Sequence, residues 1–211
     1  MSTDSSTALR YQQSDPDVRL MMRVARDDAG AFAELVSRYE SRLVRLMRSI
    51  APRPDQAEDL TQDVFLRVYR ARHRYTPGAK FSTYLYTIAG NVARNAKRSA
   101  ARRREVTEVD SPVAGDGSRI APITTTKPDA SGLMPTRRVD ADERAVIVQR
   151  AIESLSERQR MALVLSRFEH LSYAEIAETM GLSTKAVKSL LSRARVSLRD
   201  ELKPYIDDGV E

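Results

Sequence analysis

Basic and small polar side chains recur at helical spacing near the end of the chain. Between Thr184 and Arg199 there are five Lys or Arg residues and no Asp or Glu. Such a face attracts a polyanion, and the major groove of B-DNA is wide enough to admit a helix. The alternative is a solvated basic helix that only packs on its neighbours. The residue types favour major-groove DNA binding.

The stretch that contains this helix has the pattern of a helix-turn-helix. Ser172 and Glu175 have capping-box spacing and open a first short helix, which Gly181 ends because glycine adopts a left-handed turn without steric cost. A helix-turn-helix also needs a small residue where the helices cross and a branched apolar residue that seats the second helix. Ala177 and Val187 stand at those positions. The sequence therefore predicts two short helices joined by a tight turn.

A second group of residues could bind nucleic acid by a different chemistry. Asn91, Arg94, Asn95 and Arg98 share one stripe of a predicted helix, and six basic residues with no acid lie between Arg94 and Arg104. Three aromatic residues precede them, Tyr75, Tyr84 and Tyr86. Rings stack bases, amides read base edges and cations hold phosphates, a mixture that binds unpaired nucleic acid. The alternative is that the tyrosines belong partly to the core and that the basic run solubilises a helix end.

Carboxylates cluster at the start of the helix predicted over residues 55–72. Glu58, Asp59 and Asp63 lie there, and two interpretations stay open: a favourable position near the positive end of the helix dipole, or a surface that docks a protein. A metal site or a metal-dependent nuclease is a weaker alternative, because no further ligand set lies nearby and the two histidines fall in different predicted domains. We therefore expect no catalytic residue, no metal and no cofactor.

The amino-acid composition and the net charge limit the classes of protein to which the chain can belong. The chain has 211 residues, 41% of them hydrophobic and 6% aromatic, with no Trp and no Cys. No run of alternating β-branched residues predicts a strand, so we expect an all-α protein. The formal net charge of +6 favours nucleic acid as a partner. The absence of Cys excludes disulfides and thiolate zinc sites, and without a signal peptide or a membrane-length apolar stretch we expect a cytoplasmic protein.

Changes in periodicity divide the chain into two small helical domains joined by a flexible linker. We expect a disordered tail over residues 1–14, a first domain over 15–104, a linker over 105–138, a helix-turn-helix domain over 139–206 and a tail over 207–211. The linker segment is rich in Pro, Gly, Ser and Thr and is too long for a loop inside a compact domain. In the second domain, Ser156 with Gln159 predicts the start of a supporting helix.

Cap signals predict where the helices of the first domain begin. Asp15 before Pro16 predicts the N-cap of a helix that runs to a stop at Gly30. Asp55 with Glu58 is a second, capping-box-like start. Both signals place a carboxylate where it can accept hydrogen bonds from the unpaired backbone N–H groups of a first helical turn.

Three ordered motifs resemble one family. They are DQAEDLTQDVFLRVYRA from Asp55, FSTYLYTIAGNVARNAKR from Phe81 and, after the linker, LSERQRMALVLSRFEHLSYAEIAETMGLSTKAVKSLLSRAR from Leu155. Together they resemble a bacterial RNA polymerase sigma factor of the extracytoplasmic function (ECF) group, over almost the whole chain outside the tail and the linker. The resemblance implies that the first domain corresponds to sigma region 2 and the second to region 4, with region 3 absent. It implies a protein that binds core polymerase and directs promoter recognition, minus-10 melting and transcription initiation, and that is not an enzyme.

The resemblance also implies roles for individual residues. Contact with the β′ clamp helices of core polymerase would involve Asp59, Gln62, Asp63 and Arg67. Capture of a base flipped from the melted minus-10 element, with its neighbouring phosphates, would involve Tyr75, Asn91, Arg94, Asn95, Lys97 and Arg98. Binding of the duplex minus-35 element would involve Thr184, Lys185, Lys188, Ser189, Ser192, Arg193 and Arg195. The polymerase β flap and an anti-sigma factor are further implied partners, and a membrane is not.

Two residues depart from the pattern of the family. Tyr84 stands where Trp is common, and Leu190 stands where many members have Arg, so their minus-35 preference does not carry over. The alternative function is that of an autonomous helix-turn-helix repressor or activator. This function does not explain the presence of the AEDLTQDVF helix or of the aromatic loop. Such a protein should bind duplex operator unaided, whereas a sigma factor should need core polymerase.

Overall fold

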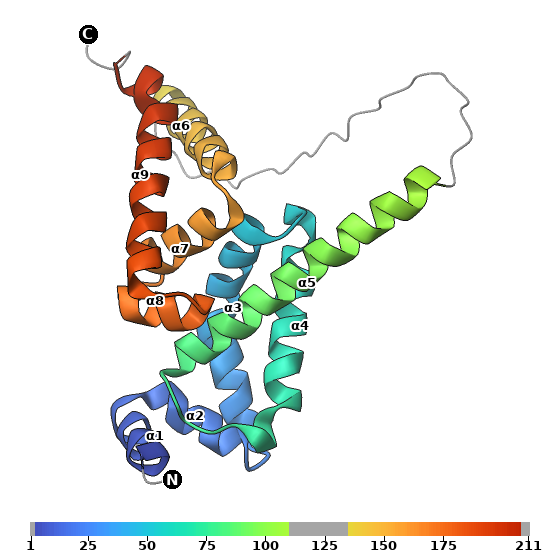
Figure 1. Cartoon of the computed structure of the whole chain (residues 1–211), viewed down its shortest axis with the longest axis vertical. Helices are drawn as coiled ribbons and strands as arrows, with labels where there is room; N and C mark the ends of the chain where they lie inside the picture. The colour runs from blue at the N-terminus through green and yellow to red at the C-terminus, as the bar shows by residue number, and fades with distance from the viewer. Residues whose placement is uncertain (1–2, 110–134, 208–211) are drawn as a thin grey trace.

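The computed structural model describes residues 3–109 and 135–207, and every regular element in this part of the chain is helical (Figure 1). The elements are α1 (Thr3–Ser14), α2 (Pro16–Val24), α3 (Ala29–Ile50), the 3-10 turn η1 (Pro54–Gln56), α4 (Ala57–Arg70), the 3-10 turn η2 (Arg72–Arg74), α5 (Phe81–Val109), α6 (Pro135–Ser154), α7 (Glu157–Arg167), α8 (Tyr173–Met180) and α9 (Thr184–Asp207). The all-α prediction is confirmed over the described residues. The predicted linker falls largely on residues 110–134, which lie outside them.

Helices α2 to α5 form the first domain around one apolar core. Helix α3 packs against α2, α4 and α5. Each helix contributes an apolar stripe, and Val18, Leu43, Val64 and Leu85 are fully buried within it. Burial of a side chain of this size stabilises the fold by about 1.5–3 kcal/mol. The core therefore holds one side of α5 in place and leaves its other side to carry polar residues.

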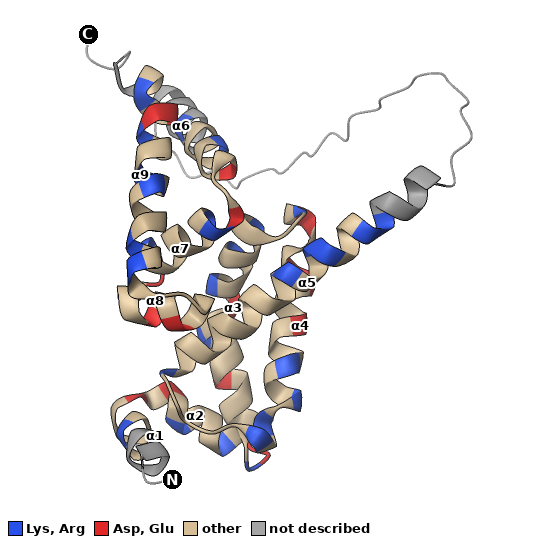
Figure 2. Ribbon diagram, viewed as in Figure 1, with Lys and Arg blue, Asp and Glu red and all other residues tan. Residues whose placement is uncertain are grey.

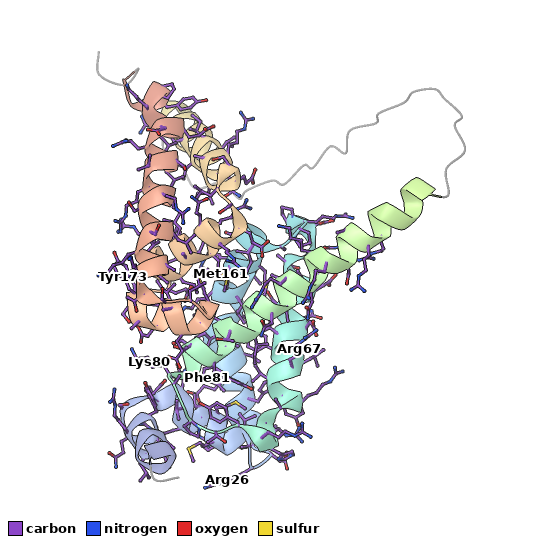
Figure 3. All side chains as sticks on the ribbon, viewed as in Figure 1. Arg26, Arg67, Lys80, Phe81, Met161 and Tyr173 are labelled. Atoms are coloured by element: carbon purple, nitrogen blue, oxygen red, sulfur yellow. The ribbon has the colours of Figure 1, made fainter. Side chains whose placement is uncertain are left out.

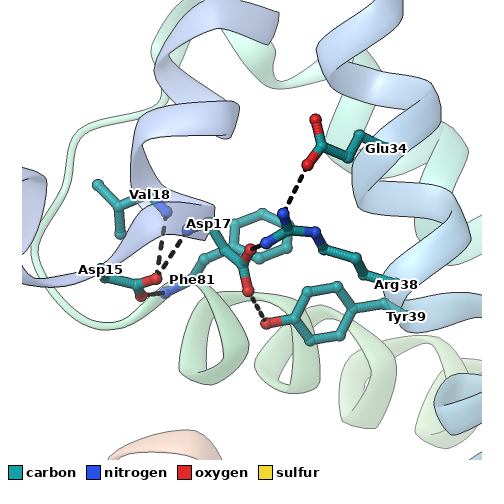
Figure 4. A network of polar contacts seen from close by, with 7 residues as sticks. All are labelled: Asp15, Asp17, Val18, Glu34, Arg38, Tyr39 and Phe81. Atoms are coloured by element: carbon teal, nitrogen blue, oxygen red, sulfur yellow. Dashed lines mark hydrogen bonds and ion pairs between the residues drawn. The ribbon is translucent and has the colours of Figure 1, made fainter.

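One carboxylate caps the first turns of two helices of this domain (Figure 4). Asp15 Oδ1 accepts the backbone N–H groups of Asp17 at 2.9 Å and Val18 at 3.4 Å, and so caps α2 as the sequence predicts. Asp15 Oδ2 accepts the backbone N–H of Phe81, the first residue of α5, at 2.9 Å. Beside it, the Tyr39 hydroxyl donates to Asp17 Oδ2 at 2.6 Å. The start of α5 is thereby fixed to the start of α2.

Two expected helix boundaries are wrong. Helix α2 ends before Asp28, whose side chain caps α3, so Gly30 lies in the first turn of α3 rather than at a stop. Asp55 caps no helix, because its carboxylate pairs with Arg53 and the chain enters α4 through η1. In both places a polar side chain nearby in sequence decides the boundary, in competition with the signal that the prediction used.

Residues 3–14 form α1, in a segment where we expected a disordered tail. Arg19 donates to the carbonyl groups of Gln12 at 3.3 Å and Gln13 at 3.0 Å, which lie in the last turn of α1 and have no partner within the helix. Tyr11 packs against the core of the first domain. Helices α5 and α6 likewise continue into the two ends of the expected linker.

Helices α6 to α9 form the second domain, and α8 with α9 is the predicted helix-turn-helix. Ser172 and Glu175 make both hydrogen bonds of a capping box at the start of α8, and Gly181 ends α8 in the left-handed conformation with φ 63°. A second capping box, at the start of α7, also forms as predicted. Helices α6, α7 and α8 all pack against α9. The local signals of this domain are therefore confirmed.

The two domains pack directly against each other. Helix α7 lies on α3 and α8 lies on α5, and one apolar cluster contains buried residues of both domains (Figure 1). Gly90 of α5 allows this approach, because a Cβ atom there would lie 2.8 Å from Cε of Met161 on α7. Met161 is labelled in Figure 3, where α7 meets the first domain.

Candidate nucleic-acid interface

The outward face of α9 carries the residues that the resemblance assigns to duplex DNA. Val187, Leu190, Leu191 and Ala194 lie on the opposite side, each at most 9% exposed, and hold α9 on the other helices of its domain. The residues of the outward face are all exposed: Thr184, Lys185, Lys188, Ser189, Ser192, Arg193 and Arg195. Figure 2 marks Lys and Arg residues along α9. A helix that is packed from behind and cationic in front can enter a major groove.

Four polar residues of α5 form two hydrogen-bonded pairs on one stripe. Arg94 donates to Asn91 Oδ1 at 2.5 Å, and Arg98 donates to Asn95 Oδ1 at 2.6 Å. Asn91, Arg94 and Arg98 are exposed, and Asn95 is half-buried. Lys97 differs from them, because its ammonium lies 2.7 Å from Oε2 of Glu157 on α7. The stripe therefore presents cations and amides to solvent, with one cation paired to the second domain.

A small pocket of about 220 Å³ lies between the loop before α5 and the first turn of α5. The rings of Tyr75 and Tyr84 meet edge to face in its wall, with centroids 5.1 Å apart and planes at 63°. Gly78 and, from α8, Glu178 also line it. The Tyr75 hydroxyl is buried without a hydrogen-bond partner, and burial raises the pKa of Tyr75 far above its usual value. The part of Tyr75 that this pocket can use is its ring.

Tyr86 does not belong to this aromatic group. It is fully buried in α5, and its hydroxyl donates to the carboxylate of Glu169 in the second domain. Burial raises the pKa of Tyr86 far above its usual value, so the phenol keeps its proton and donates. Of the two interpretations that the sequence leaves open for the tyrosines, the core position applies to Tyr86.

The residues assigned to core polymerase share the outward side of α4: Asp59, Gln62, Asp63 and Arg67. Asp63 and Arg67 form an ion pair of 2.9 Å, and Figure 3 shows Arg67 on the side of the first domain away from the second. A groove of about 700 Å³ runs between α3 and α4 and is lined by Gln62, Phe32 and Leu66. Helical periodicity does not predict this groove. The sequence feature that could have indicated it is Leu66, an apolar residue out of phase with the buried stripe of α4. In the structure the side chain of Leu66 is 51% exposed.

The carboxylates of α4 do not gather into a metal site. Glu58 faces Arg48 at 3.4 Å, and Asp63 is in the ion pair described above. Among the described residues there is no group of three or more side chains that could hold a metal ion. In the same part of the chain, no helix is both long enough and apolar enough to cross a membrane.

Comparison with known proteins matches both domains. The sigma-70 region 2 family matches residues 35–103, and the sigma-70 region 4 family matches residues 145–198. The ECF RNA polymerase sigma-E factor of Escherichia coli (strain K12) is 33% identical over 193 residues, which are 90% of this chain and 96% of that protein. The RNA polymerase sigma-H factor of Pseudomonas aeruginosa is 32% identical over 195 residues, 92% of this chain and 98% of that protein.

Two solved structures share the fold. CnrH in complex with the cytosolic domain of CnrY has a TM-score of 0.62 and 23% identity, covering 90% of this chain and 99% of that one. RpoE of Bartonella quintana in complex with the anti-sigma factor NepR has a TM-score of 0.58 and 25% identity, covering 82% and 96%. Both sigma domains are present in order, and relatives align over nearly their whole length. The chain therefore belongs to the ECF sigma factors, the subunits that direct RNA polymerase to promoters and start transcription.

Proposed function

We propose that α5 and the loop before it hold the minus-10 element as an opened strand. The observation that carries this proposal is the order of groups along one face of α5. Tyr84, Asn91, Asn95 and Arg98 follow one another at i, i+7, i+11 and i+14, which places them on one side of a helix with 3.6 residues per turn. Tyr75 adds its ring at the start of this row. An aromatic pocket followed by alternating amides and cations is an arrangement that a single strand can follow.

Each group in the row has a separate task. Flipping a base out of a duplex costs a few kcal/mol, and stacking on an aromatic ring returns about 1–3 kcal/mol per base. The pocket of Tyr75 and Tyr84 provides the ring surface, and Asn91 and Asn95 provide amides for the base edge. The adjacent phosphates would be held by Arg94, Lys97 and Arg98.

The second domain would bind the minus-35 element as duplex DNA through α9. The residues that would contact bases and phosphates are Thr184, Lys185, Lys188, Ser189, Ser192, Arg193 and Arg195. This division of tasks suits the two domains, because unpaired bases need pockets and rings whereas a duplex needs a helix that fits its groove.

Core polymerase would dock on α4 through Asp59, Gln62, Asp63 and Arg67, with the β′ clamp helices against this face and the α3/α4 groove. The exposed apolar side chain of Leu66 supports the groove as a protein contact, because a partner can bury it. The β flap would contact the second domain. We further propose an anti-sigma partner, as in the RpoE–NepR complex, and action in the cytoplasm through binding energy rather than catalysis.

Run-off transcription over a promoter library tests this function. The chain with core polymerase should yield discrete transcripts that core polymerase alone does not yield. A gel shift of the selected promoters should show a complex only when core polymerase is present. Tight binding of the chain alone to duplex DNA, with no transcript in the presence of core polymerase, would instead support an autonomous repressor.

A further inference from the structure

We propose that a basic platform at the end of the first domain, made of Arg26, Arg70 and Arg74, binds the phosphates of the non-template strand immediately downstream of the captured base. The proposal rests on the function proposed above for α5 and its pocket. It extends that site by one surface, which holds the strand between the minus-10 element and the start of transcription.

The three arginines of the platform come from three different elements. Arg26 lies in the turn between α2 and α3, Arg70 is the last residue of α4, and Arg74 is the last residue of η2. All three are exposed, and within the described part of the chain their guanidinium groups have neither a hydrogen-bond nor an ion-pair partner. Figure 3 labels Arg26 at the lower end of the first domain, away from the second domain. Their positive charges are therefore available to a ligand.

Contacts between these elements hold the platform together. Arg72 Nε of η2 donates to Asp27 Oδ1 in the α2–α3 turn at 2.7 Å, and His73 Nδ1 lies 3.1 Å from the carbonyl oxygen of Ala25. The guanidinium of Arg72 also lies over the ring of Tyr69 in α4, with Cζ 4.1 Å from the ring centroid. Each arginine of the platform is the chain neighbour of one of these residues. The three cations are therefore carried by backbone segments that are fixed to one another.

The charges at this end of the domain do not cancel. The acidic residues of the α2–α3 turn are Asp27 and Asp28, and each already has a partner: Arg72 lies 2.7 Å from Asp27, and Arg23 lies 2.8 Å from Asp28. The three cations of the platform remain in excess. A planar guanidinium matches the geometry of a phosphate and can bind two of its oxygens. A run of phosphates is therefore a ligand that suits three neighbouring arginines.

The platform begins where the aromatic pocket ends. Arg74 directly precedes Tyr75, whose ring forms part of the pocket wall. The row of amides and cations on α5 approaches the pocket from the other side, from Arg98 toward Tyr84. Beyond Arg98 the chain continues toward the second domain, which would bind the minus-35 element upstream. A strand that comes from upstream along α5 therefore leaves the pocket toward the platform, which receives its downstream phosphates.

A nucleic-acid strand fits the platform better than a second protein contact does. The face of α4 assigned to core polymerase carries both signs of charge, with Asp63 and Arg67 paired to each other at 2.9 Å. Arg70 follows Arg67 by three positions and has no such partner in the described part of the chain. Unpaired strands are held by cations that follow the backbone, beside rings that stack the bases. The platform and the pocket together supply both kinds of group.

A charge-removing variant and a matched control test the platform. The platform variant replaces its three arginines: Arg26→Ala/Arg70→Ala/Arg74→Ala. The control replaces three exposed arginines of α6 and α7 in the second domain: Arg144→Ala/Arg150→Ala/Arg167→Ala. Each variant loses one cation from the last turn of a helix, Arg70 in α4 and Arg167 in α7, so the effects on helix ends are matched.

Both variants should have the circular dichroism spectrum of the wild type and its affinity for core polymerase, because all of the replaced side chains are exposed. Titration of the labelled chain with core polymerase measures this affinity. If the platform variant alone bound core polymerase less tightly, the surface would be a polymerase contact and the proposal would fail.

Binding of single strands by the polymerase holoenzyme measures what the platform contributes. The ligands are non-template strands of a promoter selected by run-off transcription, shortened one nucleotide at a time from the 3′ end, and Asn91→Ala identifies the nucleotides that the pocket binds. In the wild type and the control, the nucleotides 3′ of these should raise the affinity by about tenfold in total, because three exposed ion pairs each contribute modestly. The platform variant should lose this gain and should bind strands that end at the pocket as tightly as the wild type does. A platform variant that keeps the gain, or that loses the effect of 5′ nucleotides instead, would overturn the proposal.

The salt dependence of the same affinities counts the phosphates that the platform holds. Each phosphate neutralised on a single strand contributes about 0.7 to the slope of log affinity against log salt, so the platform variant should have a slope shallower by about 2 on the long strand. On strands that end at the pocket, the slopes should be equal. Replacement by lysine, in Arg26→Lys/Arg70→Lys/Arg74→Lys, should retain the wild-type slope, because an ammonium also binds phosphate as a point charge. Equal slopes of the wild type and the alanine variant on the long strand would contradict the proposal.

Two results separate this proposal from the function on which it rests. If Asn91→Ala has no effect on any strand while the platform variant loses the gain from the 3′ nucleotides, the pocket is assigned wrongly and the platform stands. If Asn91→Ala weakens binding and the platform variant binds every strand as the wild type does, the pocket stands and the platform is overturned.

Discussion

The Asp15 carboxylate accepts the backbone N–H of Phe81 at 2.9 Å, so a residue before α2 caps a helix that begins 66 positions later in the chain. The loop that carries Tyr75 ends at this contact. Because the other oxygen of Asp15 caps α2, both helix starts move together. The position of the aromatic pocket therefore depends on a residue outside it.

Replacing Asp15 by Ala should lower the free energy of unfolding by about 1–2 kcal/mol or more, because loss of a single N-cap has that cost and Asp15 caps two helices. Urea denaturation followed by circular dichroism measures the change. The control is Asp55→Ala, at a carboxylate that caps no helix, which should stay within about 0.5 kcal/mol of wild type. Equal losses in the two variants would contradict the double cap.

Replacing Tyr75 by Phe should leave stability unchanged or raise it by up to about 1 kcal/mol, because the hydroxyl is buried without a partner. Tyr39→Phe is the matched control. It removes a hydrogen bond to Asp17 and should cost about 1.5–3 kcal/mol. Thermal unfolding of both variants would show the difference, and a large loss in Tyr75→Phe would mean that its hydroxyl has a partner.

Replacing Asn91 by Ala should impair transcription from a duplex promoter more than from a pre-melted one. The amide is assigned to capture of a flipped base, and pre-melting removes the cost of flipping that this capture offsets. Abortive transcription from the two templates, with core polymerase at a fixed concentration, gives the comparison. Equal loss on both templates would exclude Asn91 from strand opening.

Replacing Arg193 by Ala should weaken binding that depends on the minus-35 sequence. If Arg193 contacts a base edge, the loss is about 1–3 kcal/mol and is confined to promoters with that base. If it contacts only phosphate, binding weakens equally on all sequences and the salt dependence becomes shallower. Polymerase holoenzyme affinities for a set of minus-35 variants distinguish these results, and an unchanged affinity throughout would remove Arg193 from the interface.

Acidification should weaken the contact between α8 and the first domain. Partial burial raises the pKa of the Glu175 carboxyl, but hydrogen bonds from Lys80 and Ser172 outweigh it, and the pKa of Glu175 lies below its usual 4.5 in the folded protein. A lowered folded pKa means that the stabilisation is complete above the unfolded value and is lost as the pH falls through the folded one. The free energy of unfolding, measured by urea denaturation, should therefore decrease as the pH falls below 4.5, and less steeply in Glu175→Gln. An identical pH profile in the two proteins would show that Glu175 has no such effect.

Local signals in the sequence predicted the second domain well. The capping box of Ser172 and Glu175 and the left-handed Gly181 depend on residues within one turn of each other, so their partners are visible in the sequence. The same kind of signal failed at Asp55, because Arg53 competes for the carboxylate. A capping pattern identifies a possible hydrogen bond, and the neighbouring charges decide whether it forms.

Contacts between distant residues could not be predicted from spacing. Glu169 and Arg42 are 127 positions apart, and nothing in their local sequence pairs them. Glu178 lines the aromatic pocket only because α8 packs on α5, so its place there cannot be predicted from the sequence. Helical periodicity shows which side of a helix is apolar, but it does not show which helix covers it.

The exposed face of α9 is held in position by the three helices packed behind it, α6, α7 and α8. A change in α6, α7 or α8 that shifts the packing behind α9 would therefore alter DNA binding without replacing any residue of the outward face.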